Sequence, residues 1–159
     1  LKQGHRELLL VLGSPEPEDT HLRLNGCRKA LAEYGLSMRN VHTINGFYSA
    51  KETAAAFRQY RTENQALPRA IFAFNDDMAL SIMKELRLAG VRVPEEVAVV
   101  GFDGIDASDY MGLTTVEVPM IEMGKEAVRI LAARIAKPNL KAPHVVLKSK
   151  LVIRESSRP

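Results

Sequence analysis

The sequence predicts an α/β fold in which a parallel sheet is flanked by helices. Short, mostly apolar segments alternate along the chain with longer segments whose apolar residues recur at helical spacing. This alternation is typical of parallel sheets with right-handed crossovers. The clearest unit is residues 70–104, where a strand, an amphipathic helix and a second strand follow one another. Hydrophobic residues at 46% and charged residues at 26% are ordinary globular values, so one packed domain is expected.

Each predicted element has its own local signal. The strands are short, mostly apolar runs bounded by glycine, proline or asparagine. The helices repeat apolar residues every three or four positions, and several of them end at glycine. Ser49 and Glu52 have the spacing of a capping box at the start of one helix. In chain order we predict strand 7–12, helix 20–34, strand 41–44, helix 49–62, strand 70–74, helix 76–89, strand 97–102, strand 114–118, helix 120–136 and extended segments 144–147 and 150–154.

Polar side chains follow two of the predicted strands at the point where each strand ends. Asn75 follows the strand at 70–74, and Asp103 follows the strand at 97–102. In an open parallel sheet, ligands bind outside the carboxyl ends of the strands. An amide and a carboxylate at that edge supply the donors and acceptors that a small polar ligand needs. The sequence therefore predicts a binding module, with helix or turn caps as the alternative role for both residues.

The sequence lacks the patterns of common enzymes and metal sites. No glycine-rich phosphate or dinucleotide loop follows a strand, no Gly-x-Ser-x-Gly elbow is present, and the four histidines are too scattered for zinc. Asp103, Asp106 and Asp109 do not match a calcium-binding loop. We therefore expect no enzyme activity, no cofactor and no metal. The net charge of +3 comes from scattered Lys and Arg, which favours solvated helix faces over a DNA-binding surface.

Cysteine usage and hydropathy indicate the compartment. The single cysteine, Cys27, excludes an internal disulfide and fits a reducing environment, so we expect a cytoplasmic protein. Cys27 lies in a helical pattern, where we interpret it as a small packing residue and not as a reactive thiol. No secretory leader and no apolar run of membrane length are present, and we expect no membrane contact.

Short motifs along the chain occur in an informative order. They are Gly4-His5-Arg6, Arg23-Leu24-Asn25-Gly26, Asn75-Asp76-Asp77-Met78-Ala79, Val93-Pro94, Val99-Val100-Gly101-Phe102-Asp103, Leu113-Thr114-Thr115-Val116 and Leu151-Val152-Ile153-Arg154-Glu155-Ser156. Together they resemble the second half of a protein of the lactose/purine repressor (LacI/GalR) family. The chain departs from the family pattern at Gly104, where members often have a second aspartate, and at Met111-Gly112, where prolines are common.

The resemblance implies a periplasmic-binding-protein-like (type I) core of two subdomains that clamp an effector, only part of which is present. Residues 1–109 would form the C-terminal subdomain, 110–136 a strand and helix that cross into the N-terminal subdomain, and 137–159 a returning tail. The family's helix-turn-helix DNA-binding domain has no counterpart in this sequence. The implied function is effector binding by a ligand-responsive transcriptional repressor that reaches operator DNA only through that domain. A periplasmic sugar-binding protein of a transport system is the alternative, because it shares the fold.

The resemblance also assigns effector-binding residues. Arg23, Asn75 and Asp103 match positions that contact the effector in the family. Phe47 lies close to where some members stack an aromatic ring on the ligand, a role that Tyr48 could fill instead. A guanidinium, an amide and a carboxylate suit a sugar or a similar polar metabolite. The alternatives are a solvated helix position for Arg23 and simple packing for Phe47.

The family's dimer contacts map to helix 76–89 and to residues 107–112. We expect Ile82 and Leu86 to face the sheet and Leu80 and Met83 to form an apolar seam between two copies. A two-fold contact needs a self-complementary patch, which mixed apolar and charged side chains provide. The sequence therefore predicts a homodimer whose interface residues are Leu80, Met83, Lys84 and Arg87.

Overall fold

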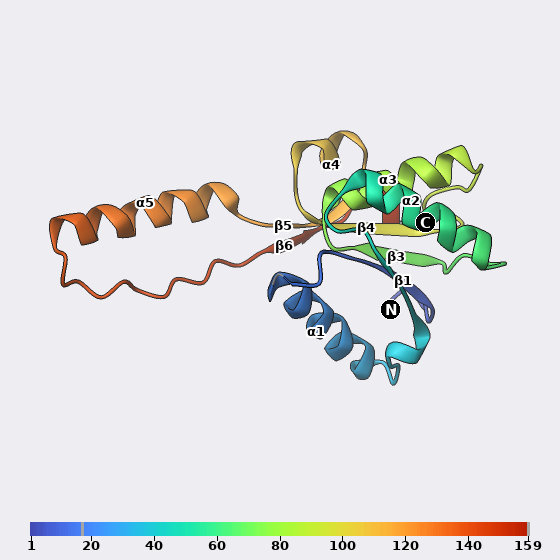
Figure 1. Ribbon diagram of the computed structural model, residues 1–159, viewed down its shortest axis with the longest axis horizontal. Helices are drawn as coiled ribbons and strands as arrows, with labels where there is room; N and C mark the ends of the chain where they lie inside the picture. The colour runs from blue at the N-terminus through green and yellow to red at the C-terminus, as the bar shows by residue number, and fades with distance from the viewer. Residues whose placement is uncertain (17, 159) are drawn as a thin grey trace.

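The computed structural model describes residues 1–16 and 18–158, and its centre is a six-stranded sheet (Figure 1). The strand order is β2-β1-β3-β4-β5-β6, and all neighbours are parallel except β6, which runs antiparallel to β5. Helices α2 and α3 cover one face of the sheet, and α1 lies on the other. The strands are β1 (Leu8–Leu12), β2 (Val41–Asn45), β3 (Ala70–Ala73), β4 (Ala98–Asp103), β5 (Thr114–Glu117) and β6 (Lys150–Val152). The helices are α1 (Glu18–Glu33), α2 (Ala50–Glu63), α3 (Asp76–Leu88), α4 (Asp106–Tyr110) and α5 (Met120–Ala136), with short 3-10 turns at Met38–Asn40 and Glu155–Ser157.

The predicted alternation of strands and helices is confirmed, and three local features add to it or differ from it. Of the two predicted extended segments, 150–154 contains β6, whereas 144–147 pairs with no strand because it lies away from the sheet edge. Helix α4 was not predicted, since five residues are too few to show a helical period. The capping box of α2 is half formed. Ser49 Oγ accepts from the backbone N–H of Glu52 at 3.3 Å, but the N–H of Ser49 donates to Gly46 O at 2.9 Å and so does not need the Glu52 carboxylate.

The core lies between the sheet and the α2–α3 layer. On α3, Met78, Ile82 and Leu86 are spaced one helical turn apart and are fully buried, as expected for the face that packs on the sheet. Half-buried Leu80 and Met83 lie at the rim of the same cluster. On the α1 side, Cys27 is half-buried against the core, and burial raises the pKa of its thiol to about 11, which fits the predicted packing role. The fully buried apolar side chains are Leu9, Leu10, Val11, Leu31, Phe57, Ile71, Ala73, Phe74, Met78, Ala79, Ile82, Leu86, Val99 and Leu113.

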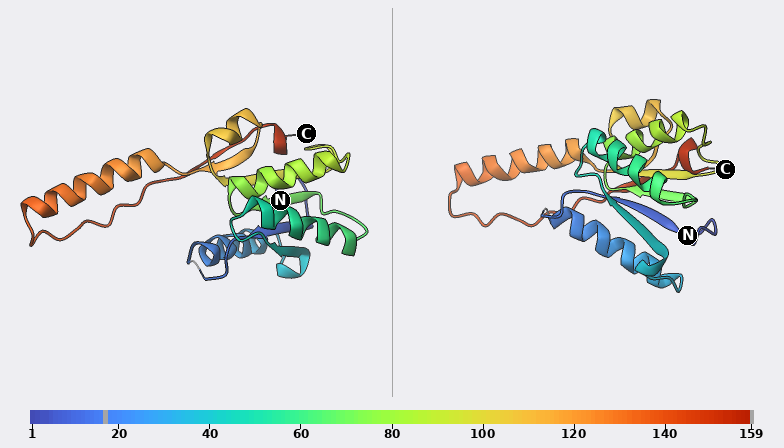
Figure 2. Two further views of the ribbon diagram at one scale, coloured as in Figure 1. Left: turned by 45° about the horizontal axis from the view of Figure 1, so that its top comes forward. Right: turned by 45° about the vertical axis from the view of Figure 1, so that its right-hand side comes forward.

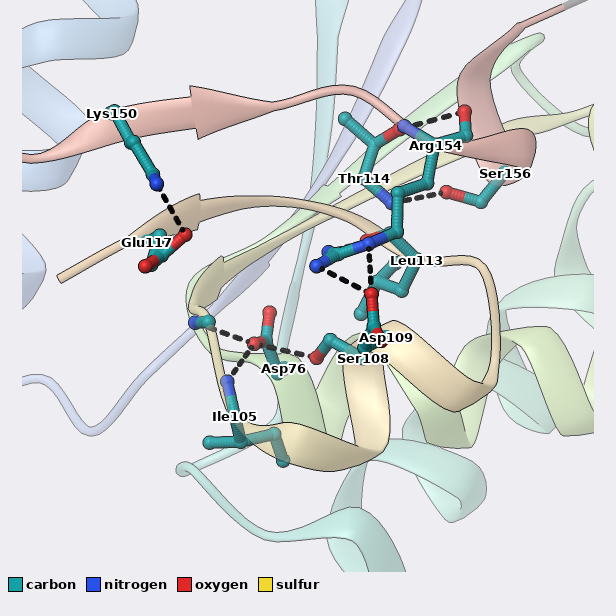
Figure 3. Close-up of polar contacts among 11 residues, drawn as sticks. Asp76, Ile105, Ser108, Asp109, Leu113, Thr114, Glu117, Lys150, Arg154 and Ser156 are labelled. Carbon is teal, nitrogen blue, oxygen red and sulfur yellow. Dashed lines mark hydrogen bonds and ion pairs between the residues drawn. The ribbon is translucent and has the colours of Figure 1, made fainter.

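The predicted transfer of the strand at 114–118 to a second subdomain is wrong. Strand β5 pairs in parallel with β4, with Thr114 opposite Val100 and Thr115 opposite Gly101. Both threonines are buried, and their hydroxyls bond to groups of this same domain. The tail packs beside them, because Ser156 Oγ accepts from Thr114 N–H at 2.8 Å (Figure 3). The same oxygen donates to Val99 O at 2.7 Å. These contacts hold β5 in the sheet.

Only the chain after β5 leaves the domain. Helix α5 and residues 137–149 project from the sheet as a long arm, and the chain then returns to form β6 (Figures 1 and 2). The apolar side chains of α5 are exposed, including Ile121, Val128, Leu131 and Ile135. That α5 belongs to a second subdomain stays a prediction. Across the described residues, no helix combines the length and apolarity needed to cross a membrane.

Candidate functional site

The carboxyl ends of β3 and β4 bring Arg23, Asn75 and Asp103 to one edge of the sheet. Arg23 reaches this edge from α1, where its Nη1 donates to Phe74 O at 2.6 Å, one residue before Asn75. Its guanidinium carbon lies 4.2 Å from the centroid of the Phe102 ring, one residue before Asp103. The predicted placement of Asn75 and Asp103 at one edge of a parallel sheet is therefore confirmed, and ligand binding at that edge stays a prediction.

Arg23 is held in place on several sides. Its side chain is only 17% exposed, and besides the Phe74 carbonyl it contacts the hydroxyl of Tyr48 at 3.3 Å and the carboxylate of Asp19 at 3.6 Å. A solvated helix residue would not be buried and bonded in this way. The guanidinium is therefore fixed toward the end of the sheet, and its planar fork is available for directed hydrogen bonds.

Asn75 has a structural task as well as a place in the site. Its Oδ1 accepts from the backbone N–H of Met78 at 2.9 Å, which caps α3. The capping role that the sequence left open is thus present. The cap uses the amide oxygen and leaves the amide nitrogen as the group that can donate to a ligand.

Asp103 lies at the end of β4 in a conformation that costs free energy. Its φ of 122° is outside the regions that residues with a side chain prefer. The pKa of its carboxyl is raised to about 6, chiefly by burial; Arg23 opposes this rise, whereas Asp76, Asp77 and Asp19 add to it. Among the described residues, no protein group donates a hydrogen bond to this half-buried carboxylate. A strained, desolvated carboxylate at a sheet edge is a common feature of functional sites.

The carboxylate of Asp76 fixes the turn that follows Asp103. It is fully buried and accepts four hydrogen bonds, from Gly104 N–H at 2.7 Å, Ile105 N–H at 3.0 Å, Ser108 Oγ at 2.7 Å and Thr115 Oγ1 at 2.6 Å. Figure 3 shows the contacts with Ile105 and Ser108. The sequence indicated only a carboxylate at the start of a helix. The Asn-Asp-Asp motif carried the signal, but it does not say which aspartate is buried.

Tyr48, and not Phe47, contacts Arg23. The two residues form the turn after β2 and both have positive φ, at 54° and 58°. Phe47 is 47% exposed, whereas the Tyr48 hydroxyl bonds to Thr20 Oγ1 at 2.9 Å and accepts from Arg23. A Cβ at Gly13 would overlap the Tyr48 ring, so glycine at the end of β1 makes room for it. Ligand contact by Phe47 stays a prediction, and Tyr48 joins the candidate site.

The four residues predicted for a dimer interface line one groove. Leu80, Met83, Lys84 and Arg87 of α3 face a groove of about 800 Å³ whose rim includes Met111, the residue after α4. The structure thus brings together the helix and the loop that the resemblance named. Within the described part of the chain, no group of three or more His, Cys, Asp or Glu side chains could hold a metal ion.

Comparison with known proteins places this geometry in a family. The model of the periplasmic binding protein-like domain matches residues 1–157. The HTH-type transcriptional repressor PurR of Photobacterium profundum is 35% identical over 158 residues, which are 98% of this chain and 47% of that protein. The chain belongs to the periplasmic-binding-protein-like family, as the effector-binding core of a LacI/GalR-type regulator.

Two further relatives of this LacI/GalR-type core carry ribose in their names. The ribose operon repressor of Escherichia coli is 30% identical over 99% of this chain and 48% of its own length. A LacI family transcriptional regulator from Enterococcus faecium, solved with bound ribose, is 26% identical with a TM-score of 0.91 over 99% of this chain and 59% of that one. The chain therefore spans about half the length of the curated relatives it matches.

The raised pKa of Asp103 predicts a pH-dependent effect on stability. A carboxyl whose pKa rises from 3.8 to about 6 on folding stabilises the folded state below pH 3.8, and this contribution is lost as pH rises through 6. Asp103→Asn removes the charge and tolerates the positive φ, so it should raise the melting temperature at neutral pH. Because Asp103 is half-buried and screened by solvent, we expect a gain of roughly 2–4 °C.

Thermal unfolding of both proteins at about pH 7.5 and about pH 4 checks this prediction. The difference in melting temperature should become small at the lower pH, where the wild-type carboxyl is protonated in the folded state and partly protonated in the unfolded state. An Asp103→Asn variant that melts below the wild type at neutral pH would contradict the assigned desolvation.

Proposed function

We propose that this chain is the C-terminal half of the effector-binding core of a transcriptional repressor that senses a neutral, polyhydroxylated molecule such as a sugar. The observation that carries the proposal is the arrangement of Arg23 and Asp103 at the carboxyl ends of the strands. Arg23 is already bonded and stacked, whereas no protein donor among the described residues reaches the Asp103 carboxylate. The site therefore offers carboxylate oxygens that are free to accept hydrogen bonds from a ligand.

The charge around the site favours a neutral effector. The single guanidinium of Arg23 is opposed by Asp19 at 3.6 Å and by the nearby Asp103. An anionic ligand would be repelled by these two carboxylates. The hydroxyl groups of a neutral ligand suit this site, because each can donate a hydrogen bond to the Asp103 carboxylate or accept one from the Asn75 amide nitrogen.

The relatives support regulation over transport. Both curated relatives are repressors, which favours this proposal over a periplasmic sugar-binding protein. In the complete repressor, operator DNA would be contacted by a separate domain, and effector binding would change the angle between subdomains. A cytoplasmic location and the absence of enzyme activity belong to the same proposal.

Calorimetry on the complete protein with D-ribose and D-ribose 5-phosphate tests the effector class. We expect D-ribose to bind and the phosphorylated sugar to bind at least about tenfold more weakly, because the added charge meets Asp19 and Asp103. A preference for the phosphorylated sugar, or binding of neither compound, would contradict a neutral sugar of this size as the effector. Other neutral sugars in the same assay extend the test.

The groove along α3 is proposed as the two-fold interface of a homodimer. Replacing Leu80 and Met83 with Glu puts like charges across the axis, and we expect monomers in place of dimers. Leu88→Glu is the matched control, since Leu88 lies on the same helix, is 69% exposed and does not line the groove. Light scattering measures the outcome. If the double variant remains a dimer, the contact lies elsewhere, with the exposed face of α5 as the next surface to test.

A further inference from the structure

Four groups form a hydrogen-bonded chain whose direction is fixed by the donors available. Thr20 Oγ1 donates to Ser14 O at 2.7 Å, because a carbonyl oxygen can only accept. The single hydroxyl proton of Thr20 is thereby used. Tyr48 must then be the donor in the hydrogen bond of 2.9 Å between its hydroxyl and Thr20 Oγ1. Arg23 Nη1 in turn donates to the Tyr48 oxygen at 3.3 Å.

This direction determines what Tyr48 can offer to a ligand. Its proton is committed to Thr20, so its oxygen can accept but cannot donate. The two protons on Arg23 Nη1 are also committed, to Phe74 O and to Tyr48. The guanidinium is therefore held in one orientation, with Nη2 3.6 Å from Asp19 Oδ2, and the N–H groups of Nε and Nη2 remain as its donors for a ligand.

The surroundings of Thr20 and Tyr48 show that this arrangement is built into the fold. Thr20 lies in the first turn of α1 and is 4% exposed, so its hydroxyl is shielded from water. Tyr48 is in a left-handed conformation with φ of 58°, and its ring fits over Gly13, where a Cβ would overlap it. Strained backbone of this kind persists where neighbouring contacts determine it, and functional sites often contain it.

We propose that Thr20 is a positioning residue of the effector site, whose hydroxyl orients the Tyr48 hydroxyl and, through it, the guanidinium of Arg23. The proposal rests on the effector site described above and adds a residue that does not touch the ligand. It also means that the Tyr48 oxygen can only accept a hydrogen bond from the effector. The effector must then place a donor, such as a sugar hydroxyl, next to Tyr48. Without Thr20, the Tyr48 hydroxyl rotates freely and its bond with Arg23 weakens.

The first experiment measures the hydrogen bond directly and needs no effector. In the 159-residue chain labelled with ¹³Cζ-tyrosine, the exchange rate of each tyrosine hydroxyl can be measured by NMR, and Tyr48→Phe identifies one signal among the four tyrosines. We expect the Tyr48 hydroxyl to exchange at least about tenfold faster in Thr20→Val and at the wild-type rate in Thr20→Ser. Thr62→Val is the matched control, because the Thr62 hydroxyl donates to Gln59 O on α2. An unchanged exchange rate in Thr20→Val overturns the proposal.

The second experiment measures D-ribose affinity in the complete protein by calorimetry. We expect Thr20→Val to weaken binding about fivefold, Thr20→Ser to restore it, and Thr20→Val to add less than about twofold in a Tyr48→Phe background. An equal loss in both backgrounds overturns the positioning role, because Thr20 would then act without Tyr48. If the wild type does not bind D-ribose, the proposed effector fails, and the hydroxyl exchange rates alone decide the role of Thr20.

Discussion

Replacing Asp76 with Asn should destabilise the domain by about 3–5 kcal/mol. The carboxylate is fully buried and accepts from two backbone N–H groups and two hydroxyls. An amide at the same place turns one acceptor into a donor and leaves buried donors without partners. The side chain at position 76 also packs closely against Gly101, since a Cβ on Gly101 would overlap Asp76 Oδ1. The amide therefore has no room to shift toward other partners.

Asp77→Asn is the matched control for this prediction. Asp77 is the next residue in the same first turn of α3, but it is exposed. Its charge interacts with the helix end and with the Asp103 carboxylate, and its loss should cost no more than about 1 kcal/mol. Urea unfolding of both variants measures the difference. Equal losses for the two aspartates would mean that the buried network contributes no more than a helix end does.

Replacing Arg23 with Ala should weaken D-ribose binding to the complete protein roughly 30- to 150-fold, which corresponds to about 2–3 kcal/mol. The guanidinium is the one cation placed at the ends of β3 and β4 by contacts that the structure shows with Phe74, Tyr48 and Phe102. Charge-assisted hydrogen bonds to ligand hydroxyls are lost with it. The change also removes contacts within the site, so thermal unfolding must accompany the binding measurement.

Arg28→Ala provides the comparison for Arg23. Arg28 lies on the same helix, is exposed, and bonds to Asn25 Oδ1 at 2.9 Å within α1. Its removal takes away one positive charge without touching the site, and D-ribose affinity should change less than about twofold. If Arg23→Ala leaves the affinity unchanged while the fold is intact, Arg23 does not contact the effector.

Local sequence signals were sufficient for most of the fold. The apolar run before Gly13 predicts β1, the spacing of Ile82 and Leu86 predicts the buried face of α3, and Gly35 marks the end of α1. Each of these depends on properties of neighbouring residues: periodicity, capping and glycine conformation. The boundaries shifted by a few residues because fraying and capping depend on contacts that periodicity does not encode.

The site was predicted less completely, because its chemistry comes from residues far apart in the chain. That Asn75 and Asp103 end two strands is visible in the sequence, and parallel pairing is enough to bring them to one edge. The choice between Phe47 and Tyr48 depends on which ring fits over Gly13, and that is decided by the packing of two separate turns. The sequence did not single out Thr20 as a site residue, since a threonine near the start of a helix is most simply interpreted as a cap.

The sequence by itself determined the α/β alternation, the polar strand ends and the family resemblance, because all three are written in short-range patterns and their order. Only the tertiary structure decided that β5 stays in the sheet, that Asp76 and not Asp77 is the buried anchor, and that Arg23 is bonded on several sides. Each of these outcomes depends on hydrogen bonds with hydroxyls and carbonyls that are distant in the sequence and close in the folded chain. Burial makes an unpaired polar group costly, so the pairing of distant residues fixes each of these positions.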